Sequence, residues 1–214
     1  MVSRPRALFG FMIAISVVAW THPAQADFKS LLGRVPGDAN TVVLIDVEKM
    51  LGSPLGIREG WKAKMANAYA SKPLVVPPNA NRVIMAAWID PGNLETIWEV
   101  SVMDLAKAPS LDSIARLEGG YLDKFASIPA VWSPINAYFI QFEAQVLGAA
   151  SPANRQFASR WAAGKLVTSG KALSAYLSGA AGTVSAETPI VMAMDLQDVT
   201  CATKVRRRLA TETF

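Results

Sequence analysis

Short apolar runs bounded by turn residues recur along the chain, and they constrain its fold more than any other feature. Residues 41–47 (TVVLIDV) form a nearly continuous run rich in β-branched residues, which indicates a strand buried on both faces. Residues 82–90 (RVIMAAWID) indicate a second apolar strand, and residues 96–103 alternate as a strand with one solvated face. The intervening Pro-Gly-Asn at 91–93 predicts a hairpin.

Helical patterns alternate with these strands. Residues 53–69 begin with a serine cap and a proline, and apolar side chains then recur every four positions, which predicts a helix. Residues 110–118 predict a second helix that ends at Gly119. Residues 138–146 alternate as a further strand. This order predicts an α+β fold of the ferredoxin-like, or split βαβ, type, with an antiparallel sheet and helices on one face.

The first 26 residues have the pattern of an export signal. Arg4 and Arg6 precede an apolar run over residues 7–20, and Ala-Gln-Ala at 24–26 fits a small-x-small cleavage site. The apolar run is short for a membrane-spanning helix, which needs roughly 20 residues. We therefore expect cleavage before Asp27 and an exported product, periplasmic or extracellular, with no integral membrane span. A transmembrane anchor is the alternative.

We expect the rest of the chain to divide into two parts. Residues 27–150 would form the ferredoxin-like unit, and residues 151–214 would supply helices and the start of a second, incomplete unit. Residues 42–47 (VVLIDV) and 191–196 (VMAMDL) match in pattern, which favours a repeat, although two buried strands can also match by chance. A fragment of a longer repeat protein fits the same pattern.

The residue composition excludes several common chemistries. His22 is the only histidine and lies in the signal, so the mature chain cannot build a Ser-His-Asp triad or a histidine-ligated zinc site. Cys201 is the only cysteine, which excludes an intrachain disulfide or a CxxC pair. No phosphate-loop, dinucleotide, zincin or nucleophile-elbow motif occurs. We expect no cofactor, and the small net charge of +4 does not favour nucleic acid as a partner.

An aspartate lies at the end of each of four predicted apolar strands: Asp46, Asp90, Asp104 and Asp195. In a ferredoxin-like sheet the first and third strands are parallel neighbours, so Asp46 and Asp104 would lie together at one edge. Two close carboxylates can share a cation or act as an acid–base pair, as in a glycoside hydrolase. The alternative is that each carboxylate accepts hydrogen bonds from loop or helix-start amides.

Five tryptophans follow the signal, and their positions separate two roles. Trp61, Trp98 and Trp161 fall on the inward faces of the predicted elements, which predicts core packing. Trp132 lies in residues 129–134, a segment with a proline at each end, which predicts a rigid loop that presents the ring to solvent or to a partner. Trp132 is therefore the preferred contact residue.

A basic cluster, Lys204 with Arg206, Arg207 and Arg208, lies near the end of a helix predicted over residues 199–209. We expect these cations to complement the carboxyl end of that helix on a solvated face. Contact with an anionic lipid or polymer is the alternative.

Residues 35–40 (VPGDAN), which lead into the strand at 41–47 and then into Ser-Pro-Leu-Gly at 53–56, resemble uncharacterised exported bacterial proteins. The resemblance implies an exported protein with repeated α+β units and assigns no activity. We therefore expect a non-catalytic binding or scaffold protein of the cell envelope, with an envelope protein or a polysaccharide as partner. A carboxylate-dependent enzyme or a cation-binding protein that uses Asp46 and Asp104 is the alternative.

Overall fold

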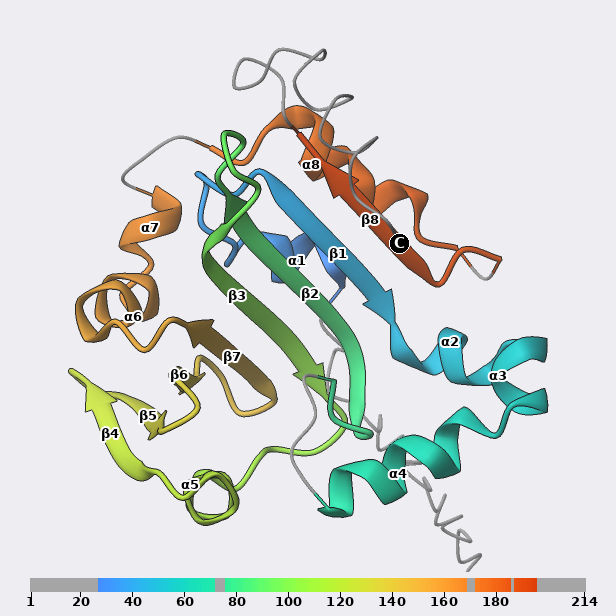
Figure 1. The fold of residues 1–214 in the computed structure, drawn as a ribbon, viewed down its shortest axis with the longest axis horizontal. Helices are drawn as coiled ribbons and strands as arrows, with labels where there is room; N and C mark the ends of the chain where they lie inside the picture. Colours follow the sequence, from blue (N-terminus) through green and yellow to red (C-terminus); the bar gives the residue numbers. More distant parts are fainter. Residues whose placement is uncertain (1–26, 72–75, 169–171, 186, 196–214) are drawn as a thin grey trace, which may run out of the picture.

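An eight-stranded antiparallel sheet organises the part of the chain that the structure describes. The computed structural model describes residues 27–71, 76–168, 172–185 and 187–195. The strand order is β4-β5-β6-β7-β3-β2-β1-β8, and every neighbouring pair is antiparallel. Figure 1 shows β7 beside β3, where the half of the sheet formed by β4 to β7 meets the other half. The chain is therefore an α+β protein, as its sequence predicts.

The strands follow the apolar runs of the sequence. They are β1 (Thr41–Asp46), β2 (Ala80–Ile89), β3 (Thr96–Leu105), β4 (Tyr121–Phe125), β5 (Ile128–Ser133), β6 (Ala137–Gln141), β7 (Val146–Ser151) and β8 (Ile190–Met194). The predicted β2–β3 hairpin is confirmed. Its turn is held by Asp90, whose Oδ1 accepts a hydrogen bond from the Gly92 amide at 2.7 Å.

The helices are short, and most begin at a polar cap. They are α1 (Phe28–Leu32), α2 (Val47–Gly52), α3 (Pro54–Arg58), α4 (Trp61–Ser71), α5 (Leu111–Glu118), α6 (Arg155–Ala162), α7 (Lys165–Thr168) and α8 (Ala175–Gly179), with a 3₁₀ turn η1 at Ala180–Thr183. Ser53 caps α3, and Ser110 caps α5. Gly119 ends α5 in the left-handed conformation with φ of 67°, as predicted. No helix among the described residues is long and apolar enough to cross a membrane.

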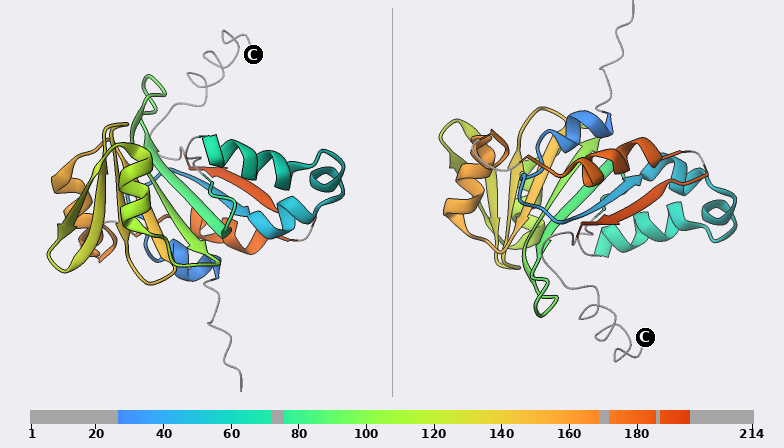
Figure 2. Two further views of the ribbon diagram at one scale, coloured as in Figure 1. Left: turned by 90° about the horizontal axis from the view of Figure 1, so that it is seen from below. Right: turned by 90° about the horizontal axis from the view of Figure 1, so that it is seen from above.

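Helices cover both faces of the sheet, so the expectation of helices on one face is wrong. On one face, which we call the α6 face, strand residues such as Val42 and Val102 pack with α1, α6 and α8 into the larger core. On the opposite face, which we call the α5 face, Val83 and Met103 pack with α2, α4 and α5 into a smaller core. The views in Figure 2 place α1 and α4 on opposite sides of the sheet.

The strand pairing does not confirm the ferredoxin-like arrangement. That arrangement makes the first and third strands parallel neighbours, whereas here β2 lies between β1 and β3 and pairs with both. The strands β1 and β3 cannot pair because both sides of β3 are occupied. The hairpin places β2 on one side of β3, and β7 pairs with the other side. The sheet also extends to eight strands, because three consecutive hairpin connections join β4 to β7 and β8 pairs with the other edge of β1.

Three local expectations need correction. The helix predicted over residues 53–69 is two helices, α3 and α4, separated at Gly60, which has a φ of 63°. Residues 138–146 are not one strand but parts of β6 and β7, which are joined by a tight turn in which the Val146 amide donates to the Glu143 carbonyl at 3.3 Å. Alternation runs through this turn without a glycine or proline, so the pattern alone does not mark it. Residues 129–134 are not a loop but mostly β5, which is paired on both sides.

The strand β8 belongs to the same sheet as the rest, because it pairs antiparallel with β1 at the sheet edge. The division of the chain into two units remains a prediction. The basic cluster, Cys201 and the helix predicted over residues 199–209 lie outside the described residues, as does the export signal.

Candidate binding groove

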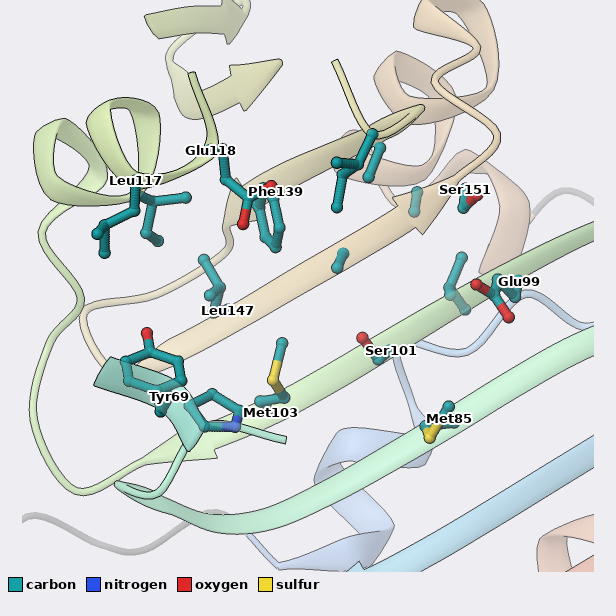
Figure 3. A pocket seen from close by; sticks show the side chains of 17 residues that line it. Tyr69, Met85, Glu99, Ser101, Met103, Leu117, Glu118, Phe139, Leu147 and Ser151 are labelled. Atoms are coloured by element: carbon teal, nitrogen blue, oxygen red, sulfur yellow. The ribbon is translucent and has the colours of Figure 1, made fainter. Parts of the chain in front are cut away.

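A groove on the α5 face lies where α5 and the end of α4 leave the middle of the sheet uncovered. The strands β3 and β7 form its floor, with Met103 and Leu147 directly paired across them. The side chain of Tyr69, near the end of α4, closes one corner, and Leu117 of α5 overhangs another (Figure 3). The groove encloses a volume of about 220 Å³.

Most of the groove lining is apolar. Besides the floor residues, the lining includes Met85, Ile114, Leu117, Ile135, Phe139 and Ala149. Two of these side chains reach solvent at the rim, since Leu117 is 60% exposed and Ile135 is 66% exposed. Large exposed apolar side chains that adjoin an apolar hollow are typical of binding surfaces.

Two carboxylates occupy different ends of the groove. Figure 3 shows Glu118 beside Phe139 on the α5 side, and Glu99 with Ser151 at the other end. Glu118 accepts a hydrogen bond from the buried Ser133 hydroxyl at 2.7 Å, which fixes its direction. Glu99 is exposed, and it takes part in none of the ion pairs found among the described residues. Because no described lining residue is Lys, Arg or His, the groove carries negative charge.

The apolar floor continues across the sheet beyond the groove. One cross-strand row on the α5 face runs from β8 to β6 through the directly paired residues Met192, Val43, Met85, Ser101, Ala149 and Phe139. Five interstrand spacings of about 4.8 Å make this strip about 24 Å long. At its far end Met192 is 65% exposed. The strip is therefore longer than a small molecule requires.

Asp46 is placed at the end of β1, where it caps α2. Its Oδ1 accepts a hydrogen bond from the Lys49 amide at 3.1 Å, and its Oδ2 lies 2.9 Å from the Lys49 Nζ. The carboxylate is thus occupied by the helix start, as one of the two sequence interpretations expects. It also lies at the edge of a second, wider cavity of about 820 Å³ between α1 and the α8–η1 segment.

Asp104 and Asp46 are not neighbours, which corrects the expectation that they meet. Arg82 of β2 pairs with Asp46 on one side and with Asp104 on the other, so two interstrand spacings, about 10 Å, separate the acidic residues. Asp104 is 3% exposed, and its Oδ2 accepts a hydrogen bond from the Asn81 Nδ2 at 3.1 Å. Among the described residues, no group of three or more His, Cys, Asp or Glu side chains is arranged to hold a metal ion.

Trp132 lies in β5, on the α6 face and away from the groove. Its ring is half-buried and stacks on Tyr121 of β4, with ring centroids 5.1 Å apart. Trp98 and Trp161 are buried in the core, as predicted, at 9% and 1% exposure. Trp61 is only half-buried.

The groove itself was not predicted from the sequence. Its floor depends on the pairing of β3 with β7, which are far apart along the chain. Leu117 gave no signal, because its spacing from Ile114 places it on the apolar face of the predicted helix, although 60% of the side chain is exposed in the fold.

Comparison of the chain with protein-family models, with curated proteins and with solved structures finds no match in any of the three.

Proposed function

We propose that the chain is an exported, non-catalytic binding protein of the cell envelope whose groove on the α5 face holds an apolar, positively charged segment of a partner protein. The observation that carries this proposal is an apolar groove with carboxylates at two ends and no basic side chain in its described lining. Apolar burial would supply the affinity, and the carboxylates would select the charge of the partner.

The length of the apolar strip supports a protein segment rather than a small ligand. An α-helix rises 1.5 Å per residue, so a helix of about 16 residues spans the strip of about 24 Å. An amphipathic helix that lies on such a surface buries side chains at positions i, i+3, i+4 and i+7. The exposed Leu117 and Ile135 would extend this contact along one side of the groove.

The charge of the groove supports a basic partner. Glu99 is exposed and Glu118 has one carboxylate oxygen bonded to Ser133, so both can accept hydrogen bonds from a lysine or arginine side chain. An acidic partner would place like charges side by side at both ends, which disfavours binding.

Export is the second part of this proposal, and it is testable on its own. We expect the periplasmic or secreted protein to have a mature amino terminus at Asp27, which intact-mass measurement determines directly. A chain that keeps Met1 and fractionates with the membrane would contradict export by a cleaved signal.

The groove is tested with a synthetic amphipathic helical peptide of about 16 residues that carries leucines on one face and lysines on the other. We expect saturable binding in a fluorescence anisotropy titration. The variant Ala149→Trp, which fills the groove floor, should weaken binding by at least about tenfold, a loss of about 1.4 kcal/mol.

Ala144→Trp is the matched control, because Ala144 is exposed in the β6–β7 turn outside the groove. This variant should bind the peptide like the unaltered protein. Equal loss of binding in both variants, or no loss in either, would contradict the proposed groove.

A further inference from the structure

Three aromatic side chains form a cross-strand row at the β4 edge of the sheet. Tyr121, Trp132 and Tyr138 are directly paired across β4, β5 and β6, so they share the α6 face. Tyr138 is buried, Trp132 is half-buried, and Tyr121 is 54% exposed. Because β4 is the outermost strand of the sheet among the described residues, the ring of Tyr121 stands at its edge.

The ring of Tyr121 is held in place from behind. Its plane lies 25° from that of Trp132, with the ring centroids 5.1 Å apart, so one ring face packs on Trp132 and the other is turned outward. The preceding Gly120 lets β4 approach β5 closely, since a Cβ at this position would lie 1.9 Å from the Trp132 carbonyl oxygen. The outer face of Tyr121 is therefore a positioned, solvent-exposed aromatic surface.

A charged pair lies beside this ring on the same face. Asp123 is two residues along β4 from Tyr121, which places it about 7 Å away on the same side of the sheet. Arg155, the first residue of α6, donates from Nη2 to the Asp123 Oδ1 at 2.9 Å and to the Lys124 carbonyl at 3.3 Å. The Arg155 side chain is 61% exposed, so the guanidinium remains accessible.

Asp123 stays charged in this setting. Burial acts to raise the pKa of Asp123, but hydrogen bonds from the Lys124 amide and the Arg155 guanidinium, with help from the Tyr138 hydroxyl, lower it further than burial raises it. The site therefore offers a donor, the Arg155 guanidinium, and an acceptor, the Asp123 carboxylate, next to one flat ring. The Asp123 side chain is 16% exposed, and its Oδ1 already accepts from the Lys124 amide at 2.7 Å and from Arg155. Arginine has five N–H donors, and only Nη2 is used in the contacts described above.

We propose that this surface binds carbohydrate, with a sugar ring stacked on the outer face of Tyr121 and its hydroxyl groups bonded to Arg155 and Asp123. A pyranose has an apolar C–H face and hydroxyls that both donate and accept, so it needs an aromatic face with a donor and an acceptor within a sugar ring's reach. The arrangement of Tyr121, Arg155 and Asp123 meets that need. A stable protein interface buries about 800 Å² on each partner, far more than one exposed ring offers.

This site is independent of the groove, because it lies on the α6 face and the groove lies on the α5 face. Leu122, the β4 residue between Tyr121 and Asp123, points to the α5 face instead. The two sites together would let the protein hold an envelope polysaccharide and a partner protein at once.

The test is isothermal titration calorimetry with three soluble probes: cellohexaose, chitohexaose and laminarihexaose. We expect at least one of them to bind saturably. Tyr121→Ala should weaken that binding by at least about tenfold, a loss of about 1.4 kcal/mol, and Tyr121→Phe, which keeps the ring, should retain it within about threefold. Arg155→Gln should weaken it as well, because a donor is lost.

Tyr176→Ala is the matched control, since Tyr176 is a tyrosine of α8 that is 63% exposed and distant in the sequence from β4. It should leave binding unchanged, and near-ultraviolet circular dichroism should show that each variant is folded. The carbohydrate site is overturned if none of the three probes binds at millimolar concentration, or if folded Tyr121→Ala binds like the unaltered protein.

Discussion

Asp46 and Asp195 make the same main-chain hydrogen bond at opposite ends of the β1–β8 pair. The Asp46 amide donates to the Pro189 carbonyl at 2.8 Å, and the Asp195 amide donates to the Asn40 carbonyl at 2.7 Å. The two donors are 149 residues apart in the sequence, and so are the two acceptors. The two strands therefore pair about a local two-fold axis, as any two antiparallel strands do, so this symmetry does not by itself show a repeat. The repeat itself remains a prediction.

The hydrogen-bond directions along β8 predict how it tolerates proline. The Asp195 amide points to β1, and directions alternate along a strand, so the amide of Ala193 also points to β1 and that of Met192 points to the outer edge. Met192→Pro should cost less than about 1 kcal/mol, because edge strands accept proline. Ala193→Pro should cost about 3 kcal/mol or more. Urea denaturation measures both, and equal costs would contradict this edge.

The hydrogen bond from the Lys49 amide to Asp46 predicts a helix-capping role for that carboxylate. Asp46→Asn should change the free energy of unfolding by less than about 1 kcal/mol, because Asn caps about as well as Asp, whereas Asp46→Ala should cost about 1–2 kcal/mol. Thermal melts with calcium and with chelator should agree for the unaltered protein, for Asp46→Asn and for Asp104→Asn. A calcium-dependent stabilisation that both Asn variants lose would instead establish a cation site.

Asp123 predicts a pH dependence of stability. Because its pKa in the folded protein is lowered from 3.8, its ion pair with Arg155 contributes stability above that pH and loses it as the pH falls through the lowered value. Asp123→Asn should therefore be less stable than the unaltered protein at pH 5–8, and the difference should shrink below about pH 4. Urea titrations at several pH values measure this, and a difference that stays constant down to about pH 2 would contradict the assignment.

The core leaves no room for a side chain at Gly148 of β7. A Cβ there would lie 2.4 Å from Phe142 Cε2 and 2.7 Å from Trp161 Cη2, so Gly148→Ala should cost about 1–3 kcal/mol. Phe142→Leu should relieve part of that cost, giving a less than additive double variant. Gly179→Ala is the control, because a Cβ there meets nothing within 4 Å and the substitution should be neutral or stabilising. A cost for Gly148→Ala no larger than for the control would contradict this packing.

The strands and helix caps that depend only on neighbouring residues could be predicted from the sequence. The runs that form β1, β2 and β3 are apolar and bounded by turns, and Ser53 and Gly119 cap α3 and α5 as their residue types predict. The pattern does not indicate β4, because this strand has five residues, two of them charged, and Pro129 makes the residues of β5 resemble a loop. The partners of each strand depend on contacts between distant residues, which no local pattern contains.

The candidate sites were predictable to a smaller extent. Trp132 lies in a paired strand rather than in the loop that its flanking prolines predict, and its stacking partner Tyr121 is set by the β4–β5 register. Asp46 and Asp104 were expected to meet because the assumed topology placed their strands together, and β2 separates them instead. Glu99 gave no sequence signal, because its position in the groove depends on which strands lie beside β3 and on α5.

The most direct measurement of the proposed function is a charge exchange at Glu99. The affinity of the lysine-bearing amphipathic peptide and of a matched peptide with glutamate in place of lysine is measured for the unaltered protein and for Glu99→Lys. We expect the unaltered protein to prefer the basic peptide, and Glu99→Lys to lose at least about tenfold in affinity for it while gaining affinity for the acidic one. If the unaltered protein binds the two peptides equally, and Glu99→Lys changes neither affinity, the groove does not select a basic partner.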